Sequence, residues 1–275
     1  MSGPTGTPPR PTGTAPSPTA PGPTAAAGHG SVIVTIAALT ARSLLGRRRS
    51  LLLALLALLP VVIAILVRLS GRAGSEEEVA TAIMDRLIVT TLLPIVGLVF
   101  GTAALGAELE DGTAVFLLVK PIDRWRIVVA KLIVAVGLSI ALVAPASFMA
   151  GAILQPGDTW LAGAVGAAVG TAIGATVYAT VFFALSLVTG RALAIGLIYV
   201  LVWEGILAGL LEGIQALSIR QYTLAISAAI ADPGAVDPSL LDARVALALS
   251  AVAVAVAVVI AVRRLASYEI SQADD

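Results

Sequence analysis

The amino-acid sequence predicts an all-α, polytopic integral membrane protein, and three observations lead to that fold class. Hydrophobic residues make up 58% of the 275 positions and charged residues only 12%, whereas soluble domains have roughly 45–50% apolar and about 25% charged residues. The apolar residues are concentrated in blocks of about 20, the length that an α-helix needs to cross a bilayer. The blocks show no alternation with a period of two, which excludes a membrane β-barrel.

Six such blocks occupy the region 51–268, which we assign to the membrane domain. At about 1.5 Å per residue, each block can cover a hydrocarbon core of about 30 Å. Pro145 predicts a kink in the third. The predicted spans are 51–67, 87–107, 127–154, 160–188, 192–211 and 245–262.

The segments outside the spans differ sharply in composition. Residues 1–30 hold eight prolines among Gly, Thr and Ala, and such a segment cannot bury enough apolar surface to fold, so we expect a disordered cytoplasmic tail. Residues 31–50 combine helical apolar spacing with an arginine run, which predicts an amphipathic helix in the membrane interface. The alternative is a frayed start of the first span. Residues 269–275 form a second cytoplasmic tail.

The placement of lysine and arginine sets the orientation. With the N-terminus inside, eleven of these residues lie near inner helix ends and five near outer ends, which places both termini in the cytoplasm. The inner residues are Arg42, Arg47, Arg48, Arg49, Lys120, Arg124, Arg126, Lys131, Arg191, Arg263 and Arg264. The outer residues are Arg68, Arg72, Arg86, Arg220 and Arg244.

Several kinds of chemistry are excluded by composition. The formal net charge is zero, and no basic stripe with interleaved aromatics is present, so nucleic-acid binding is not expected. The chain has no cysteine, and His29 is its only histidine. A thiol nucleophile, a Ser-His-Asp relay and a His-based metal site therefore cannot form within one chain. The only lysines are Lys120 and Lys131, and neither follows a glycine, so no phosphate-binding P-loop exists.

Two further segments carry local patterns. Gly166, Gly170 and Gly174 repeat at four-residue spacing on one helix face, which predicts close helix packing, with substrate lining as the alternative. Between the last two spans, apolar residues alternate with Arg220, Gln221 and Ser227, which predicts a short amphipathic helix at the outer surface.

The inner loop between the second and third spans is the most informative stretch. Acidic residues come first, then a Gly-Thr pair, a short apolar run and a Lys-Pro pair, after which Asp123 can cap the third helix. This pattern predicts a rigid amphipathic elbow, suited to transmit force from a cytoplasmic partner. Its candidate coupling residues are Glu108, Glu110, Asp111, Gly112, Thr113, Phe116, Pro121 and Arg124.

The loop resembles that of the permease subunits of ABC-2 class ATP-binding-cassette transporters. The shared pattern is acidic-x-acidic-x-Gly-Thr, then Phe-Leu-Leu-x-x-Pro, then Arg, then Lys. It falls at Glu108, Glu110, Gly112, Thr113, Phe116, Leu117, Leu118, Pro121, Arg124 and Lys131. The interfacial helix, the six spans, the outer amphipathic segment and the stretch 199–205 extend the resemblance over about residues 32–268.

The resemblance implies a permease of the bacterial cytoplasmic membrane that pairs with a second copy or a related chain. The elbow would dock on a separate ATP-binding subunit, which would bind ATP and magnesium, and the direction would be export. The chain itself would be no enzyme and would bind no cofactor. The alternatives are a passive solvated loop, an accessory or scaffold membrane protein, a secondary transporter and an intramembrane enzyme.

Glu204 is an acidic residue placed well inside an apolar block. It lies roughly 18 Å from the inner end of the fifth predicted span, counted at about 1.5 Å per residue. A carboxylate at that depth should face protein, water or a break in the helix. One interpretation is that Trp203, Glu204 and Gly205 begin a re-entrant turn that shapes an outer gate, with Glu204 accepting hydrogen bonds from freed backbone N–H groups. The other is that the span ends early and Glu204 is hydrated.

Overall fold

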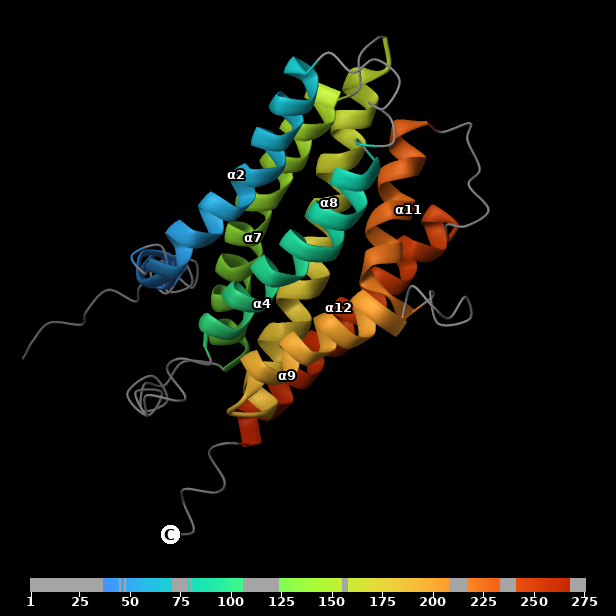
Figure 1. Ribbon diagram of the computed structural model, residues 1–275. Coiled ribbons are helices and arrows are strands. Elements are labelled where there is room, and N and C mark those ends of the chain that lie inside the picture. The colour runs from blue at the N-terminus through green and yellow to red at the C-terminus, as the bar shows by residue number, and fades with distance from the viewer. Residues whose placement is uncertain are drawn as a thin grey trace, which may run out of the picture.

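The computed structural model describes residues 37–44, 46, 48–70, 79, 81–105, 124–154, 158–207, 217–232 and 241–267. All regular secondary structure in these ranges is helical, which confirms the predicted all-α class. The helices form an elongated bundle in which the chain passes back and forth along one long axis (Figure 1).

Five helical segments are long and apolar enough to cross a membrane, which confirms the prediction of a polytopic membrane protein. They are α2 (Arg48–Leu69), the π-helix η1 (Ile83–Leu92) continued by α4 (Leu93–Ala103), α7 (Arg124–Leu154), α8 (Trp160–Val188) and α12 (Ala243–Ser267). Pro145 lies inside α7. A shorter apolar segment, Ala192–Gly205, stands where the fifth span was predicted.

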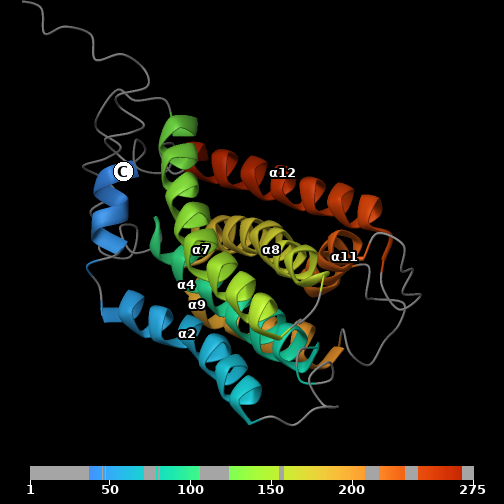
Figure 2. The same cartoon turned by 90° about the horizontal axis from the view of Figure 1, so that it is seen from above.

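Helix α8 is the centre of the bundle. It contacts α7, α4, α11 (Ile219–Ala231) and α12, and the view from above shows it among these helices (Figure 2). About 67% of its most apolar stretch is buried, against 28% for α2 and 22% for α12. These two peripheral helices therefore leave most of their apolar surface for lipid or for another chain.

The predicted fifth span, 192–211, is not one continuous α-helix. It begins as α9 (Ala192–Ile198) and changes into the π-helix η2 (Tyr199–Leu207). The next described α-helix is α11. It lies beside the N-terminal half of α8, whereas α9 lies near the C-terminal end of α8 (Figure 1). A carboxylate in the middle of a lipid-facing helix is costly, and the N-terminus of α11 supplies Glu204 with hydrogen-bond donors.

Helix α11 is amphipathic in sequence, and several residues of its polar side are buried. Gln221, Thr223 and Ser227 are buried, and α11 packs against α8. The glycine face of α8 leaves room for Thr223 and Ser227. The position of this helix at the outer membrane surface stays a prediction.

The N-terminal region is described only in part. Residues 37–44 are helical, with Thr40 and Leu44 buried and Leu39 exposed. The interfacial position of this helix stays a prediction. Both tails, 1–30 and 269–275, lie outside the described residues.

Candidate functional site

The predicted coupling loop lies almost entirely outside the described residues. This holds for Glu108, Glu110, Asp111, Gly112, Thr113, Phe116 and Pro121. Arg124 is the first residue of α7, but its side chain is not among those described. What the structure does show is that the end of α4 and the start of α7, the two helices that flank the loop, lie at the same end of the bundle (Figure 1).

Lys131 ties these two helix ends together. Its side chain is only 1% exposed, and its Nζ donates to the carbonyl oxygen of Ala104 over 3.0 Å. Ala104 is the C-cap of α4, where unpaired carbonyls and the negative end of the helix dipole favour a cation. Lys131 is also the last residue of the pattern that carries the resemblance, so this part of the pattern has a structural role at the base of the loop.

Three glycines of α8 lie directly against α11. A methyl group placed on Gly166 would come within 2.5 Å of the Ser227 carbonyl oxygen, and one on Gly170 within 2.6 Å of the Thr223 carbonyl oxygen. A methyl group on Gly174 would strike the Thr223 side chain. This geometry supports the predicted packing role, because no larger residue fits at these positions without moving α11.

The same face of α8 continues with aromatic residues. The rings of Tyr178 and Phe182 stack with centroids 5.9 Å apart, and Tyr199 meets Phe182 edge-on at 6.2 Å. Tyr199 in turn stacks on Trp203 at 6.5 Å. Along this face of α8, at four-residue steps, glycines therefore face α11 and aromatic residues face η2. Helix α11 and the π-helix η2 cover successive parts of the same face of α8.

Glu204 lies where these two segments meet. Its carboxylate accepts hydrogen bonds from the Ser218 hydroxyl (2.6 Å), the Ile219 backbone N–H (3.0 Å) and the Tyr199 hydroxyl (3.3 Å). Ser218 is the N-cap of α11, and Ile219 is its first residue, so the acid stabilises a buried helix N-terminus. Because Glu204 is only 2% exposed, protein groups rather than bulk water solvate it. Its role in a gate stays a prediction.

A second acidic residue holds the same end of α11. Arg220 donates from Nε to one Asp85 oxygen over 2.8 Å and from Nη2 to the other over 2.7 Å. Both side chains are about four-fifths buried, and a two-pronged bond of this kind fixes orientation as well as distance. Asp85 was not among the predicted site residues, because the second span was predicted to begin at residue 87 and not at Ile83, where η1 begins.

The local sequence explains why η1 is a π-helix. Pro94 has no N–H and stands next to the junction with α4, while the Leu93 N–H reaches back five residues to the Ile88 carbonyl. The hydroxyls of Thr90 and Thr91 also donate to carbonyls five residues earlier, over 2.7 and 2.8 Å. Wide turns of this kind occur frequently at functional sites.

Three buried oxygen atoms of α8 and α11 have no hydrogen-bond partner among the described residues. They are the Tyr178 hydroxyl, Gln221 Oε1 and Ser227 Oγ. Ser227 Oγ lies against Gly170, whereas Tyr178 lies near Glu204. Unpaired polar atoms are rare inside folded proteins.

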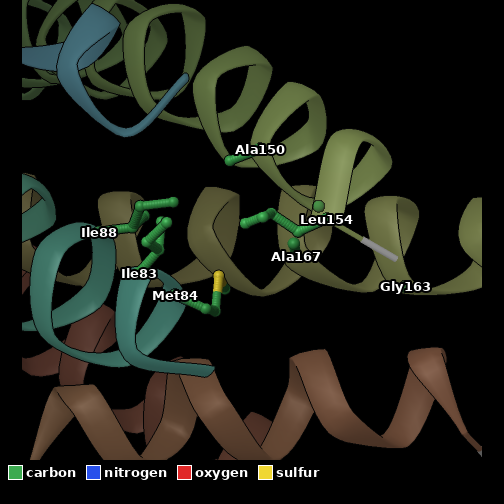
Figure 3. A pocket seen from close by; sticks show the side chains of 8 residues that line it. Ile83, Met84, Ile88, Ala150, Leu154, Gly163 and Ala167 are labelled. Carbon is green, nitrogen blue, oxygen red and sulfur yellow. The ribbon is translucent and has the colours of Figure 1, made fainter. Parts of the chain in front are cut away.

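A small cavity lies between η1, α7 and α8 (Figure 3). Its volume is about 40 Å³, and the residues that line it are Ile83, Met84, Ile88, Ala150, Gly151, Leu154, Gly163 and Ala167. Pockets that hold small molecules measure roughly 300–1,000 Å³. The cavity is therefore too small for a cargo molecule in this conformation. The described residues also contain no group of three His, Cys, Asp or Glu side chains that could hold a metal ion.

Comparison with known proteins decides the family. The model of the ABC-2 family transporter proteins matches residues 34–269, which include every described helix. The chain belongs to the ABC-2 transporter family. No curated protein matches it. The resemblance found at the loop is therefore confirmed, and the chain is a multi-pass membrane protein of a transporter family in which a permease component is the expected role.

Proposed function

We propose that the chain is the permease subunit of an ATP-driven exporter in the cell membrane. The observation that supports this most directly is the ABC-2 family match over residues 34–269, which spans the whole helical bundle. Because the sequence contains no P-loop, the chain would rely on ATP and magnesium bound to a separate ATP-binding subunit. The chain itself would bind no cofactor and catalyse no reaction.

The proposed docking element for that subunit is the loop 108–126. Two features support it. The loop carries the family pattern, and its flanking helices are joined by the bond from Lys131 to Ala104. A push on the loop would therefore reach α4 and α7 together, because this hydrogen bond and the packing of the two helices on each other join them near the loop.

Purification of the tagged chain from its native membrane tests this proposal. An ATP-binding subunit should copurify, and Gly112→Pro or Arg124→Glu should abolish stimulation of its ATPase activity while the permease still inserts. Arg86→Glu is a matched control, because it makes the same charge change on an exposed side chain at the other end of the bundle. Normal stimulation in both loop variants would show that the loop is passive. The absence of any ATP-binding chain would favour the accessory-protein and secondary-transporter alternatives.

The proposed orientation places both termini in the cytoplasm. Single cysteines can test it, because the chain has none of its own. An impermeant thiol reagent added to intact cells should label Ser75→Cys and Pro233→Cys, and it should not label Thr113→Cys or Ser267→Cys. Labelling of Thr113→Cys from outside would reverse the orientation.

The proposed assembly contains two permease chains, either two copies or a copy and a related chain. The exposed apolar faces of α2 and α12 are compatible with such a partner and equally with lipid. Copurification of differently tagged copies would show a homodimer, and recovery of a related chain in place of the second tag would show a heterodimer.

The proposed outer gate contains Trp203, Glu204 and Gly205. Its support is the position of Glu204 at the junction of η2 and α11, where one carboxylate holds two helix ends together. A residue placed there can control whether the two segments stay joined.

A further inference from the structure

The start of α11 binds a carboxylate in this structure, and that carboxylate belongs to the chain itself. Glu204 Oε1 accepts hydrogen bonds from the Ile219 N–H and the Tyr199 hydroxyl, and Glu204 Oε2 accepts one from the Ser218 hydroxyl. Donors at a helix N-terminus favour an anion, because they point the same way as the positive end of the helix dipole. The bound side chain therefore shows directly which kind of group these donors select.

The Tyr178 hydroxyl is a further donor at this place, and Glu204 does not use it. Tyr178 is fully buried and lies near Glu204, but its hydroxyl has no hydrogen-bond partner among the described residues. Tyr199 lies on η2 together with Glu204, whereas Tyr178 lies on α8. If η2 withdrew, the donors of Tyr178, Ser218 and Ile219 would remain and would need another acceptor.

The position of η2 would allow such a withdrawal. Leu201 and Val202 are exposed, so this segment lies at the edge of the described bundle. A methyl group placed on Gly205 would meet nothing closer than 3.6 Å, and the atom it would meet there belongs to η2 itself. Helices with π geometry also occur frequently at functional sites.

We propose that the start of α11 is a carboxylate-binding site, which Glu204 fills in this conformation and a carboxylate on the cargo fills when η2 withdraws. That the ligand is cargo rests on the proposed permease function. One carboxylate replaces another, so the donors are paired in both states, and Glu204 becomes hydrated at the edge of the bundle. The rings of Phe182 and Trp203 adjoin this region, so the ligand class is an amphiphile with a carboxylate head and an apolar tail.

A chain without the Glu204 carboxylate shows whether the site takes a free one. In Glu204→Ala, the atoms removed beyond Cβ are those of acetate, and the donors of α8 and α11 remain. In the full-length chain in lipid nanodiscs, hydrogen exchange of residues 217–224 should be faster than in the unaltered chain. Sodium acetate should slow it about tenfold, whereas sodium chloride at the same concentration should not.

Glu204→Leu is the matched control for this rescue. It leaves the same donors unpaired but fills the space, so acetate should not change its hydrogen exchange. Equal effects of acetate on the alanine and leucine variants, or no effect on either, would overturn the proposed site.

The unaltered Glu204 chain shows whether a ligand can replace this side chain. Trp203 stacks on Tyr199, so its fluorescence should change when η2 withdraws. The exchanges Trp125→Phe and Trp160→Phe leave it as the only tryptophan. Decanoate, added below its micelle concentration, should change the emission with saturation, whereas decanol should not. No response to decanoate would show that the donors serve Glu204 alone, and a response to decyl sulfate equal to that to decanoate would refute a carboxylate ligand.

Tyr178→Phe tests the unused donor in the same assay. It keeps the ring and removes the hydroxyl, so the dissociation constant of decanoate should rise about tenfold. An unchanged dissociation constant would exclude Tyr178 from the site. These measurements use neither ATP nor an ATP-binding subunit, so their failure is distinct from a failure of the permease function, which copurification tests.

Discussion

Replacement of Glu204 is the most direct test of the junction between η2 and α11. Glu204→Leu removes the acceptor of two strong hydrogen bonds, those of 2.6 and 3.0 Å, and of the weaker one of 3.3 Å. Each buried donor left without a partner costs about 1–3 kcal/mol, so the two strong bonds account for about 2–6 kcal/mol. Removal of a buried carboxylate returns roughly 2.5 kcal/mol on insertion scales. These opposing terms leave a local destabilisation of up to about 3.5 kcal/mol.

Glu204→Gln changes the same site but keeps a hydrogen bond to Ser218 and to the Ile219 N–H. The amide oxygen can accept from the Ile219 N–H, and the amide nitrogen can donate to the Ser218 oxygen. Only the contribution of the charge is lost, about 1 kcal/mol. Because 1.4 kcal/mol is a factor of ten, the local opening constant should rise by up to about three hundredfold in the leucine variant and by less than about tenfold in the glutamine variant.

Hydrogen exchange followed by mass spectrometry measures that opening at the first turn of α11. The purified complex in lipid nanodiscs is compared with both variants over a peptide that covers residues 217–224. Ser139→Ala is the control, because this buried hydroxyl bonds only within its own helix, to the Ala135 carbonyl. Unchanged exchange in Glu204→Leu would refute the view that Glu204 holds the start of α11.

Three other outcomes follow from the packing. Gly170→Leu should displace α11 and prevent recovery of a folded complex, whereas Gly137→Leu, where nothing lies within 4 Å, should be recovered at normal yield on size-exclusion chromatography. Lys131→Met keeps most of the side-chain volume but loses the hydrogen bond to α4. The free energy of unfolding should fall by about 1.5–3 kcal/mol, which lowers the melting temperature. A melting temperature equal to that of the unaltered chain would contradict a stabilising bond. Ser147 and Thr171 form a 2.7 Å hydrogen bond between α7 and α8. A double-mutant cycle with Ser147→Ala and Thr171→Val should give a coupling free energy of about 0.6 kcal/mol. A coupling of zero would show that this bond does not stabilise the bundle.

The sequence predicted the long helices because membrane crossing depends mainly on composition. Helix α8 has the bounds 160–188 that its apolar block gives, and α7 ends at residue 154 as its block does. A run of apolar residues bounded by polar residues or glycine has few other ways to satisfy its backbone in lipid. The glycine face of α8 could be found for the same reason, since the four-residue spacing is visible within one helix.

The split of the fifth segment and the acids that hold α11 could not be predicted in the same way. Hydropathy is summed over a window, so it does not separate an α-helix from a π-helix or detect a short break. Asp85 and Arg220 are 135 residues apart in sequence, and no spacing rule joins them. Glu204 was recognised as anomalous in an apolar block, but its partners Ser218 and Ile219 follow from the fold alone. The coupling loop stays a prediction, because its residues lie outside the described part of the chain.

The position of the break follows from the face of α8 itself. Residues four apart lie on one helix face, so Gly174 and Tyr178 are neighbours there. Glycine admits a helix backbone at close range, whereas a tyrosine ring holds its neighbour farther away. A single straight helix cannot satisfy both distances along this face. Two helical segments can satisfy both distances if they meet opposite the step from Gly174 to Tyr178. Glu204 then accepts hydrogen bonds from the first residues of the second segment, Ser218 and Ile219. Tyr178→Ala should therefore raise hydrogen exchange in η2 more than in α11. Equal changes in the two segments would contradict an origin of the break in this step of α8.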